Sequence, residues 1–137
     1  DRWLTTENEC LWYTASSSAP CDSDLKYTSV ELDSNNLAGT IPSELALLSN
    51  SLSLLNLSEN TNGLTGSIPA LLGFLTQLTS VNLSNNALVG PLAGAMGKWS
   101  KMLSINLSMN KLTGPLPSLI GIWSDLTYMN FADNDLD

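Results

Sequence analysis

The feature that most constrains the fold is a short motif that recurs five times at nearly constant spacing. Each copy alternates apolar and polar residues and then reaches an asparagine, as in Val81–Asn82–Leu83–Ser84–Asn85–Asn86. The recurring asparagines lie 24 to 26 residues apart, at Asn35, Asn60, Asn86, Asn110 and Asn134. Self-similarity at such a period indicates a stack of similar structural units rather than one irregular core.

The alternation predicts a short strand with one buried face in every copy. In the third copy the buried positions are Leu78, Val81, Leu83 and Leu88. One strand cannot bury its apolar side alone, so neighbouring copies must stack and pair as a parallel sheet. The copies are predicted over residues 27–51, 52–77, 78–101, 102–125 and, in part, 126–137.

The recurring asparagine is predicted to be structural. The chain turns where it leaves each strand, and this exposes backbone N–H and C=O groups that need partners. An amide side chain both donates and accepts, so stacked asparagines can satisfy those groups between adjacent copies. Asn86→Ala is therefore expected to destabilise the protein by roughly 1–3 kcal/mol.

The second half of each copy is also patterned. Residues 64–69 read Leu-Thr-Gly-Ser-Ile-Pro, and residues 37–42, 88–93 and 112–117 follow the same pattern. In the third copy Ala93 stands where proline is expected. Glycine permits a positive φ at the turn, and proline ends strand pairing. This half-repeat resembles the plant-type subclass of leucine-rich repeats, known from receptor-kinase ectodomains and polygalacturonase-inhibiting proteins.

The resemblance covers residues about 27–137. It implies an α/β solenoid, a right-handed superhelix of five leucine-rich repeats with a parallel β-sheet on the concave face. The convex side is expected to hold 3₁₀ turns and loops, and a second short strand is expected to follow the first in each repeat.

Residues 1–26 are predicted to form an amino-terminal cap, because the open end of a stacked core would otherwise face water. Cys10 and Cys21 both lie there and are the only cysteines. One disulfide between them is expected, and two free thiols are the alternative. Cys10–Leu11–Trp12 resembles the C-x-W element of plant-type caps, with a longer spacing to the second cysteine that leaves an algal or protist homologue open.

Charge excludes two classes of partner. The formal net charge is −8. Residues 1–33 carry −5 and residues 125–137 carry −4, whereas residues 34–124 carry +1. Clustered Lys and Arg are absent, which argues against nucleic acid and against anionic membranes. No run of apolar residues is long enough to span a bilayer.

Catalysis is not expected. The sequence contains no histidine, and it offers no nucleophile–base pair and no phosphate-binding loop. No cofactor and no metal are expected. The acidic run from Asp133 to Asp137 invites a calcium site, but Asn134 and Leu136 are structural positions of the repeat.

Strand alternation places a field of mostly small polar side chains on the concave sheet. We predict ligand binding there, on the residues that vary most among the repeats or recur in line: Leu54, Asn56, Glu59, Asn82, Asn85, Asn106, Met109, Tyr128 and Asn130. Asn56, Asn82 and Asn106 also begin Asn-Leu-Ser triplets, which are candidate N-glycosylation sites. The triplets arise from the repeat itself, so the sequence leaves their occupancy open.

Three features depart from the repeat pattern. Trp99 and Trp123 replace leucines on the convex side and are predicted to close the core, with a binding hot spot as the alternative. Thr61–Asn62–Gly63 adds two residues between Asn60 and Leu64, which predicts an outward bulge. No carboxy-terminal cap follows Leu136, so a longer chain or a larger assembly is expected to cover that edge.

The sequence therefore predicts a secreted or ectodomain module without enzymatic activity. It is expected to be an extracellular glycoprotein that binds a protein, peptide or glycan and contains a disulfide. One alternative is a structural segment of a larger assembly, and another is binding to ice or a comparable surface through the regular Ser and Asn field.

Overall fold

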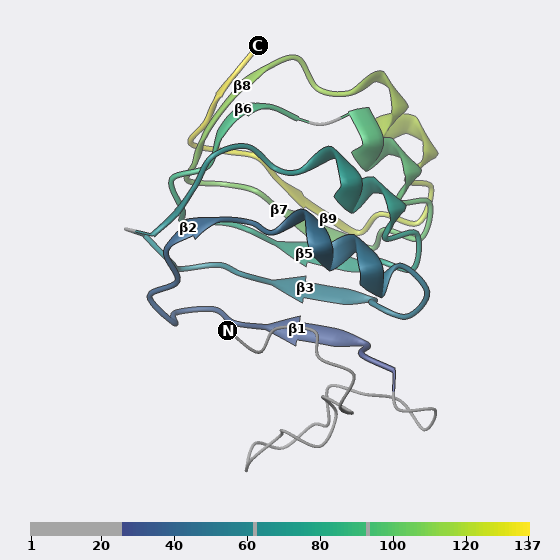
Figure 1. Ribbon diagram of the computed structural model, residues 1–137. Helices are drawn as coiled ribbons and strands as arrows, with labels where there is room; N and C mark the ends of the chain where they lie inside the picture. The colour runs from purple at the N-terminus through teal and green to yellow at the C-terminus, as the bar shows by residue number, and fades with distance from the viewer. Residues whose placement is uncertain (1–25, 62, 93) are drawn as a thin grey trace.

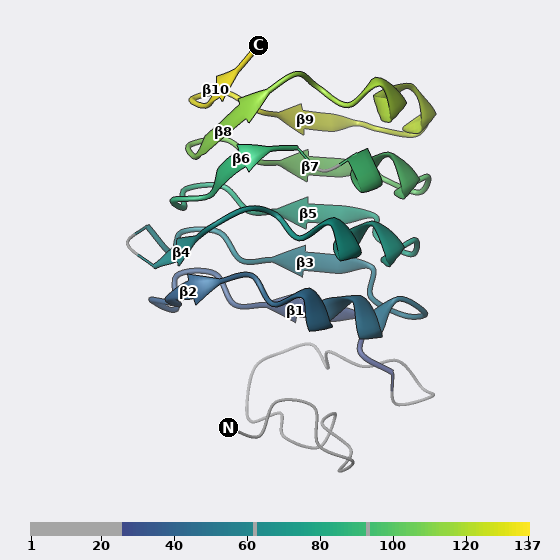
Figure 2. The same cartoon turned by 45° about the horizontal axis from the view of Figure 1, so that its top comes forward.

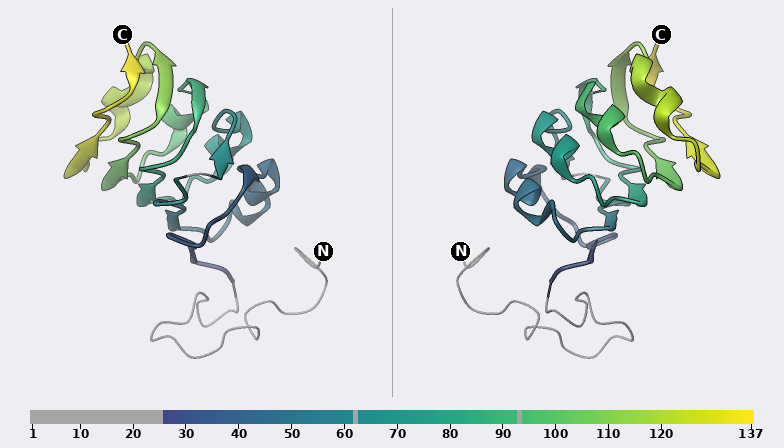
Figure 3. Two further views of the ribbon diagram at one scale, coloured as in Figure 1. Left: turned by 90° about the vertical axis from the view of Figure 1, so that its left-hand side faces the viewer. Right: turned by 90° about the vertical axis from the view of Figure 1, so that its right-hand side faces the viewer.

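In the computed structural model, residues 26–61, 63–92 and 94–137 are described. Within these ranges five turns of chain stack into a curved coil (Figure 1). The turns follow one another in order along the stack, and Figure 3 shows the arc that they form from the side. The predicted leucine-rich-repeat solenoid is confirmed.

A five-stranded parallel sheet lines one side of the coil, with strand order β1-β3-β5-β7-β9. Each strand is three residues long, in the sequence β1 (Ser29–Glu31), β3 (Leu54–Asn56), β5 (Ser80–Asn82), β7 (Ser104–Asn106) and β9 (Tyr128–Asn130). The register is unbroken, because equivalent positions of successive repeats pair with one another.

The second strand of each repeat is also present, as the half-repeat predicted. These strands form a pair and a three-stranded sheet, and they comprise β2 (Gly39–Thr40), β4 (Leu64–Thr65), β6 (Val89–Pro91), β8 (Lys111–Gly114) and β10 (Asp135–Leu136). The fixed glycine of the half-repeat has a positive φ in four repeats, between 73° and 98°, at Gly39, Gly66, Gly90 and Gly114.

Within the described residues, four 3₁₀ helices stack on the opposite side from the sheet (Figure 2). They are η2 (Ser43–Leu48), η3 (Ala70–Phe74), η4 (Gly94–Lys98) and η5 (Ser118–Ile122). Pro42 and Pro69 precede the first two with φ of −71° and −63°. Proline fixes φ near this value, so it orients the chain at the start of each helix.

The core is one continuous apolar column between the sheet and the 3₁₀ helices. The leucines of the motif are buried in the central repeats, and Trp99 and Trp123 are buried with them. The core interpretation of the two tryptophans therefore fits the structure. Beside β9, Met129 is 49% exposed, and Phe131 and Leu136 are partly buried against the core.

Several predictions fall outside the described residues. The amino-terminal cap and the Cys10–Cys21 pair lie in residues 1–25, and Ala93 is not among the described residues. The repeat boundaries remain a prediction. Within the insertion, Thr61 is exposed, as expected. The N–H groups of Gly63 and Leu64 both donate to the Asn60 carbonyl oxygen, at 3.0 and 3.4 Å, and these bonds close the turn.

Candidate binding surface

The recurring asparagines form a ladder beneath the turns that follow the sheet. Asn110 is 8% exposed, and its Nδ2 donates to the carbonyl oxygens of Leu83, Leu107 and Ser108 at 2.9, 3.1 and 3.2 Å. Its Oδ1 accepts from the N–H of Leu88, in the preceding repeat, at 3.1 Å. Asn60 and Asn134 accept in the same way from Leu37 and Leu112. The predicted structural role thus has direct geometric support at Asn60, Asn110 and Asn134, each of which joins two repeats. Asn35, the first predicted member, is exposed, and its Nδ2 donates to the Asp33 carbonyl oxygen of its own repeat at 2.8 Å.

Asn86 is the exception in this ladder. Its Nδ2 makes the usual three bonds, to the carbonyl oxygens of Leu57, Leu83 and Ser84. Its Oδ1 is buried and has no partner among the described residues. The preceding repeat is the one with the insertion, which moves Leu64 two residues further from Asn60 than its equivalents in the other repeats. The inserted turn therefore deprives Asn86 of the N–H that the other asparagines accept.

Shortening this turn is expected to stabilise the protein. The strand register is unaffected by the insertion, because Gly39 opposes Leu64 just as Gly90 opposes Leu112. Deleting residues 62–63 would give the spacing of the other repeats and bring the Leu64 N–H to Asn86. One restored hydrogen bond to a buried acceptor is expected to add about 1 kcal/mol, measured by urea unfolding. An unchanged or lower stability would contradict this account of the orphaned oxygen.

The outward surface of the sheet is built on a second asparagine series. Asn56, Asn82, Asn106 and Asn130 pair in register on successive strands, so the structure brings these four predicted residues into one row. Each is partly exposed. We call the sheet surface that carries this row the concave face.

Each asparagine of the row is held by its own repeat. Asn106 Oδ1 accepts from the N–H and the Oγ–H of Ser108, at 3.2 and 2.8 Å. Asn56 and Asn82 accept identically from Ser58 and Ser84. The three serines are 4–7% exposed, so these serines, which alternation placed on the concave field, are buried supports of the row. The serine hydroxyls thus hold the asparagines and are not available to a ligand.

The residues after the strands form a second line of candidates. Glu59, Asn85 and Met109 have φ of 60°, 55° and 56°. Asn85 Nδ2 donates a hydrogen bond to the Glu59 carboxylate. The Met109 side chain is 55% exposed. Left-handed backbone is unfavourable for side chains other than Gly, Asn and Asp. Met109 thus occupies a backbone conformation that its side chain disfavours.

Met109→Asn is expected to raise stability by about 1 kcal/mol, because asparagine tolerates the left-handed conformation and little apolar burial is lost. Asn85→Met is the matched reverse change and should lower stability by a similar amount. Chemical unfolding of both variants checks the pair. Equal stability of Met109→Asn and the parent protein would show that the turn is not strained.

Leu103 is an exposed apolar residue that sequence alternation missed. It precedes β7 and is 44% exposed. The N–H groups of Leu103 and Ser104 both donate to the Thr79 carbonyl oxygen, at 2.8 and 3.1 Å. The residue pairs 53–54, 79–80 and 127–128 share one carbonyl oxygen in the same way, so this geometry belongs to the other repeats as well. The sequence could have indicated this exposure, because the equivalent residues of three other repeats are the polar Ser53, Thr79 and Thr127.

Tyr128 is the first residue of β9, in the repeat that follows the repeat of Leu103. The Tyr128 N–H donates to the Leu103 carbonyl oxygen at 3.1 Å, and Tyr128 is 48% exposed. Leu54, equivalent to Tyr128 in the second repeat, is partly buried. The exposed apolar surface of the concave face is therefore greatest toward β9.

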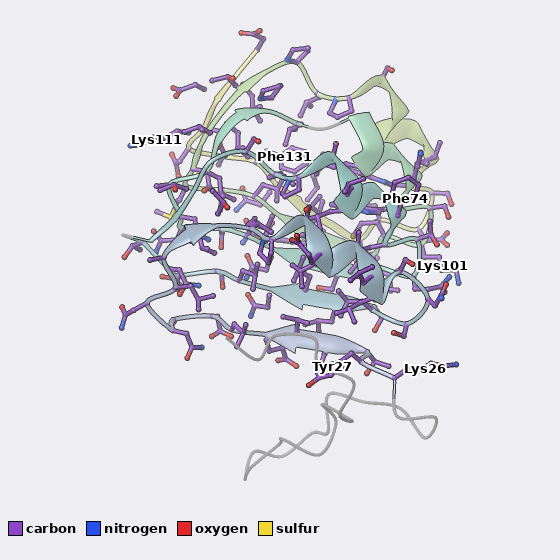
Figure 4. The ribbon with its side chains drawn as sticks, viewed as in Figure 1. Lys26, Tyr27, Phe74, Lys101, Lys111 and Phe131 are labelled. Atoms are coloured by element: carbon purple, nitrogen blue, oxygen red, sulfur yellow. The ribbon has the colours of Figure 1, made fainter. Side chains whose placement is uncertain are left out.

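Charges lie at the borders of the concave face. Glu31 and Asp33 are exposed at the β1 end, and Asp133 is exposed after β9. Asp33 accepts from Asn56 Nδ2 at 3.1 Å. Lys98 Nζ lies 4.8 Å from the centre of the Phe74 ring on the 3₁₀ side. Lys111 lies on β8, and Lys26 lies next to Tyr27, just before β1 (Figure 4). In the described ranges, no three acidic side chains gather as a metal site would require.

Comparisons with known proteins agree with this geometry. A model of the Leucine Rich Repeat family matches residues 101–122. The BIR3–SERK2 complex from Arabidopsis thaliana is 35% identical over 85% of this chain and 62% of that chain, with a TM-score of 0.76. The Arabidopsis receptor kinase HAESA, in complex with the peptide hormone IDA and the co-receptor SERK1, is 30% identical over 80% of this chain and 18% of its own, with a TM-score of 0.74.

A plant ice-binding protein is also similar, at 26% identity over 85% of this chain and 37% of its own, with a TM-score of 0.70. The chain spans less than two thirds of each of these structures. No curated protein matches it in sequence. No helix of the described part is long and apolar enough to cross a membrane.

Proposed function

We propose that this leucine-rich-repeat solenoid, similar to plant receptor-kinase ectodomains, is an extracellular, non-enzymatic module that binds a protein, peptide or glycan ligand on its concave face. The observation that carries the proposal is the chemistry of that face. A regular asparagine row is bordered by exposed Leu103, Met109 and Tyr128, which lie outside the core. Similar solenoids in complexes with a peptide hormone and a co-receptor support the same assignment.

Binding is tested by screening the purified protein against libraries of peptides, secreted proteins and glycans. Saturable binding is expected, and Tyr128→Ser should weaken it, because serine stands at the equivalent position of three other repeats. The control is Leu47→Gln, which changes a 71% exposed residue on η2, away from the sheet. Absence of binding in all three libraries, or equal effects of the two variants, would contradict the proposal.

The extracellular location is tested through covalent chemistry. In the secreted protein, Cys10 and Cys21 should be joined, because disulfides persist in oxidising compartments. Mass spectrometry of the secreted protein tests whether Asn56, Asn82 or Asn106 carries a glycan. Neighbouring strands lie about 4.8 Å apart, so occupancy of all three is not expected. Reactive thiols in the secreted protein would oppose the predicted disulfide.

A structural role in a larger assembly is the second candidate. It is supported by the apolar side chains of Met129 and Leu116, 49% and 43% exposed, which a neighbouring chain could cover. Light scattering after size-exclusion chromatography distinguishes the two candidates: a monomer favours ligand binding, and association that Met129→Lys abolishes favours assembly.

Ice binding is a third candidate, supported by the regular asparagine row and by similarity to a plant ice-binding protein. A thermal-hysteresis measurement tests it directly. Activity that Asn106→Asp reduces would support the row as the ice-binding surface, and a freezing point equal to that of the buffer would remove this candidate.

A further inference from the structure

The side of the coil opposite the sheet carries an exposed apolar line. Leu47, Phe74 and Ile122 occupy equivalent positions of η2, η3 and η5, and they are 71%, 52% and 40% exposed. Lys98 occupies the equivalent position of η4, and Leu71, 49% exposed, widens the line on η3. The helices stack one above another (Figure 2), so these side chains follow the stack. We call the line formed by residues 47, 74, 98 and 122 the 3₁₀ ridge.

A polar line runs beside the 3₁₀ ridge. Asn50, Gln77, Lys101 and Asp125 lie three residues further along the chain in successive repeats. Lys101 Nζ donates to Gln77 Oε1 at 2.6 Å, so two members of the line are in contact across neighbouring repeats. Figure 4 shows Lys101 and Phe74 on the same side of the molecule. The two lines therefore form one surface, outside the concave face.

The 3₁₀ ridge is complementary to its own reverse. When a second copy faces it in the opposite direction, η3 meets η4 of the other copy and η2 meets η5. Lys98 of each copy then faces Phe74 of the other, and Leu47 faces Ile122. In a single copy Lys98 Nζ already lies 4.8 Å from the centre of the Phe74 ring, so the central pair repeats an attraction that the protein makes within itself.

The polar line is complementary in the same direction. Lys101 would face Gln77 of the other copy, and Asp125 would face Asn50. Both pairs join a charge to an amide, and the first repeats the hydrogen bond seen within one copy. Glu44 on η2 would face η5, which carries no charged residue. If the two copies ran in the same direction, Lys98, Lys101 and Asp125 would each face a like charge, which is unfavourable.

We propose that two copies of this chain associate antiparallel through the 3₁₀ ridge. The arrangement is a closed, isologous dimer, with a two-fold axis that passes between η3 and η4. The match of charge and apolar character in both lines is the reason to assign this surface to a second copy. An exposed apolar line rimmed by polar residues is typical of an interaction surface.

The dimer is weak and leaves the sheet free. The two lines are far shorter than the roughly 20–30 residues per side of a standard stable interface, so association should depend on concentration. The concave faces lie on the sides away from the contact (Figure 2). Association through the 3₁₀ ridge therefore converts one binding face per chain into two faces per particle, which raises avidity for ligands fixed on a surface.

Sedimentation velocity of the purified chain, from micromolar to millimolar concentration, measures this dimer. Leu47→Glu and Ile122→Lys each place a charge against an apolar side chain of the other copy, and each should weaken dimerisation about tenfold. Val89→Glu is the matched control, because Val89 is 42% exposed on β6, outside the ridge, and receives the same charge as in Leu47→Glu. It should leave dimerisation unchanged. Thermal melting of every variant checks that it folds as the parent does.

The double variant Leu47→Glu/Ile122→Lys tests the direction of the contact. In the antiparallel arrangement each new carboxylate lies against a new ammonium group of the other copy, so dimerisation should return toward that of the parent. Copies that ran in the same direction would instead set like charges against each other and remain dissociated. A double variant no better than the single ones would overturn the antiparallel pairing.

Two further outcomes would contradict the dimer itself. One is a chain that stays monomeric at every concentration, which would leave ligand binding on the concave face untouched. The other is association that Met129→Lys abolishes and the ridge variants do not, because the contact would then lie beside β9. Each of these results is independent of the ligand screen, so failure of this inference and failure of the proposed function are distinguishable.

Discussion

Replacing Asn110 by alanine is expected to destabilise the protein by about 3 kcal/mol, the result of an unsatisfied buried group together with lost hydrogen bonds. The three carbonyl oxygens that Asn110 binds each retain another donor: Asn86 for Leu83, Asn134 for Leu107, and the Asn85 N–H for Ser108. The N–H of buried Leu88 has only Asn110 Oδ1. Loss of that acceptor therefore accounts for most of the expected destabilisation.

Asn86→Ala is the matched comparison. It removes a similar set of three donated bonds, but no N–H of a described residue depends on its oxygen. Its effect should be about half as large, at the lower end of the roughly 1–3 kcal/mol expected from the sequence. Urea unfolding and thermal melting measure both, with a fall in Tm of roughly 10 °C for Asn110→Ala. Equal losses would show that the orphaned oxygen is in fact satisfied.

Gly63→Ala is expected to be comparably damaging. A Cβ at this position would lie 1.5 Å from the carbonyl oxygen of Leu37 and 3.0 Å from the Cα of Ala38. Both are backbone atoms, which cannot rotate aside. The Gly63 carbonyl oxygen also accepts from the Gly39 N–H at 2.9 Å, so any shift disturbs the start of the β2–β4 pair. Overpacking against backbone should destabilise by about 3 kcal/mol.

Gly121→Ala is the control for this substitution. Gly121 lies in η5, and a Cβ there would meet nothing within 4 Å. Alanine should be neutral or slightly stabilising at this position, because it reduces the entropy of the unfolded chain. Thermal melting of the two variants side by side checks the contrast. A Gly63→Ala protein as stable as the parent would mean that the inserted turn relocates freely.

Much of the architecture was predictable because the repeat is periodic. The apolar positions at Val81 and Leu83 and the glycine at Gly90 recur in every central turn, so the strands, the positive-φ turns and the stacking direction follow from one copy. The candidate binding residues were predicted less completely. Leu103 was missed, because it precedes β7 and lies outside the strand to which the alternation of faces applies.

The sequence by itself determined the stack, since regular apolar spacing can be buried only by parallel repeats. It also determined the asparagine ladder from Asn60 to Asn134, because one amide per repeat donates to equivalent carbonyl oxygens in each of these turns. The tertiary structure alone decided how individual atoms are used. It left Asn86 Oδ1 without a donor and turned the Oδ1 atoms of Asn82, Asn106 and Asn130 toward N–H groups of their own repeats. The reason is that hydrogen-bond satisfaction depends on which atoms of neighbouring repeats come within reach, and the two-residue insertion changes that reach without changing the repeat pattern.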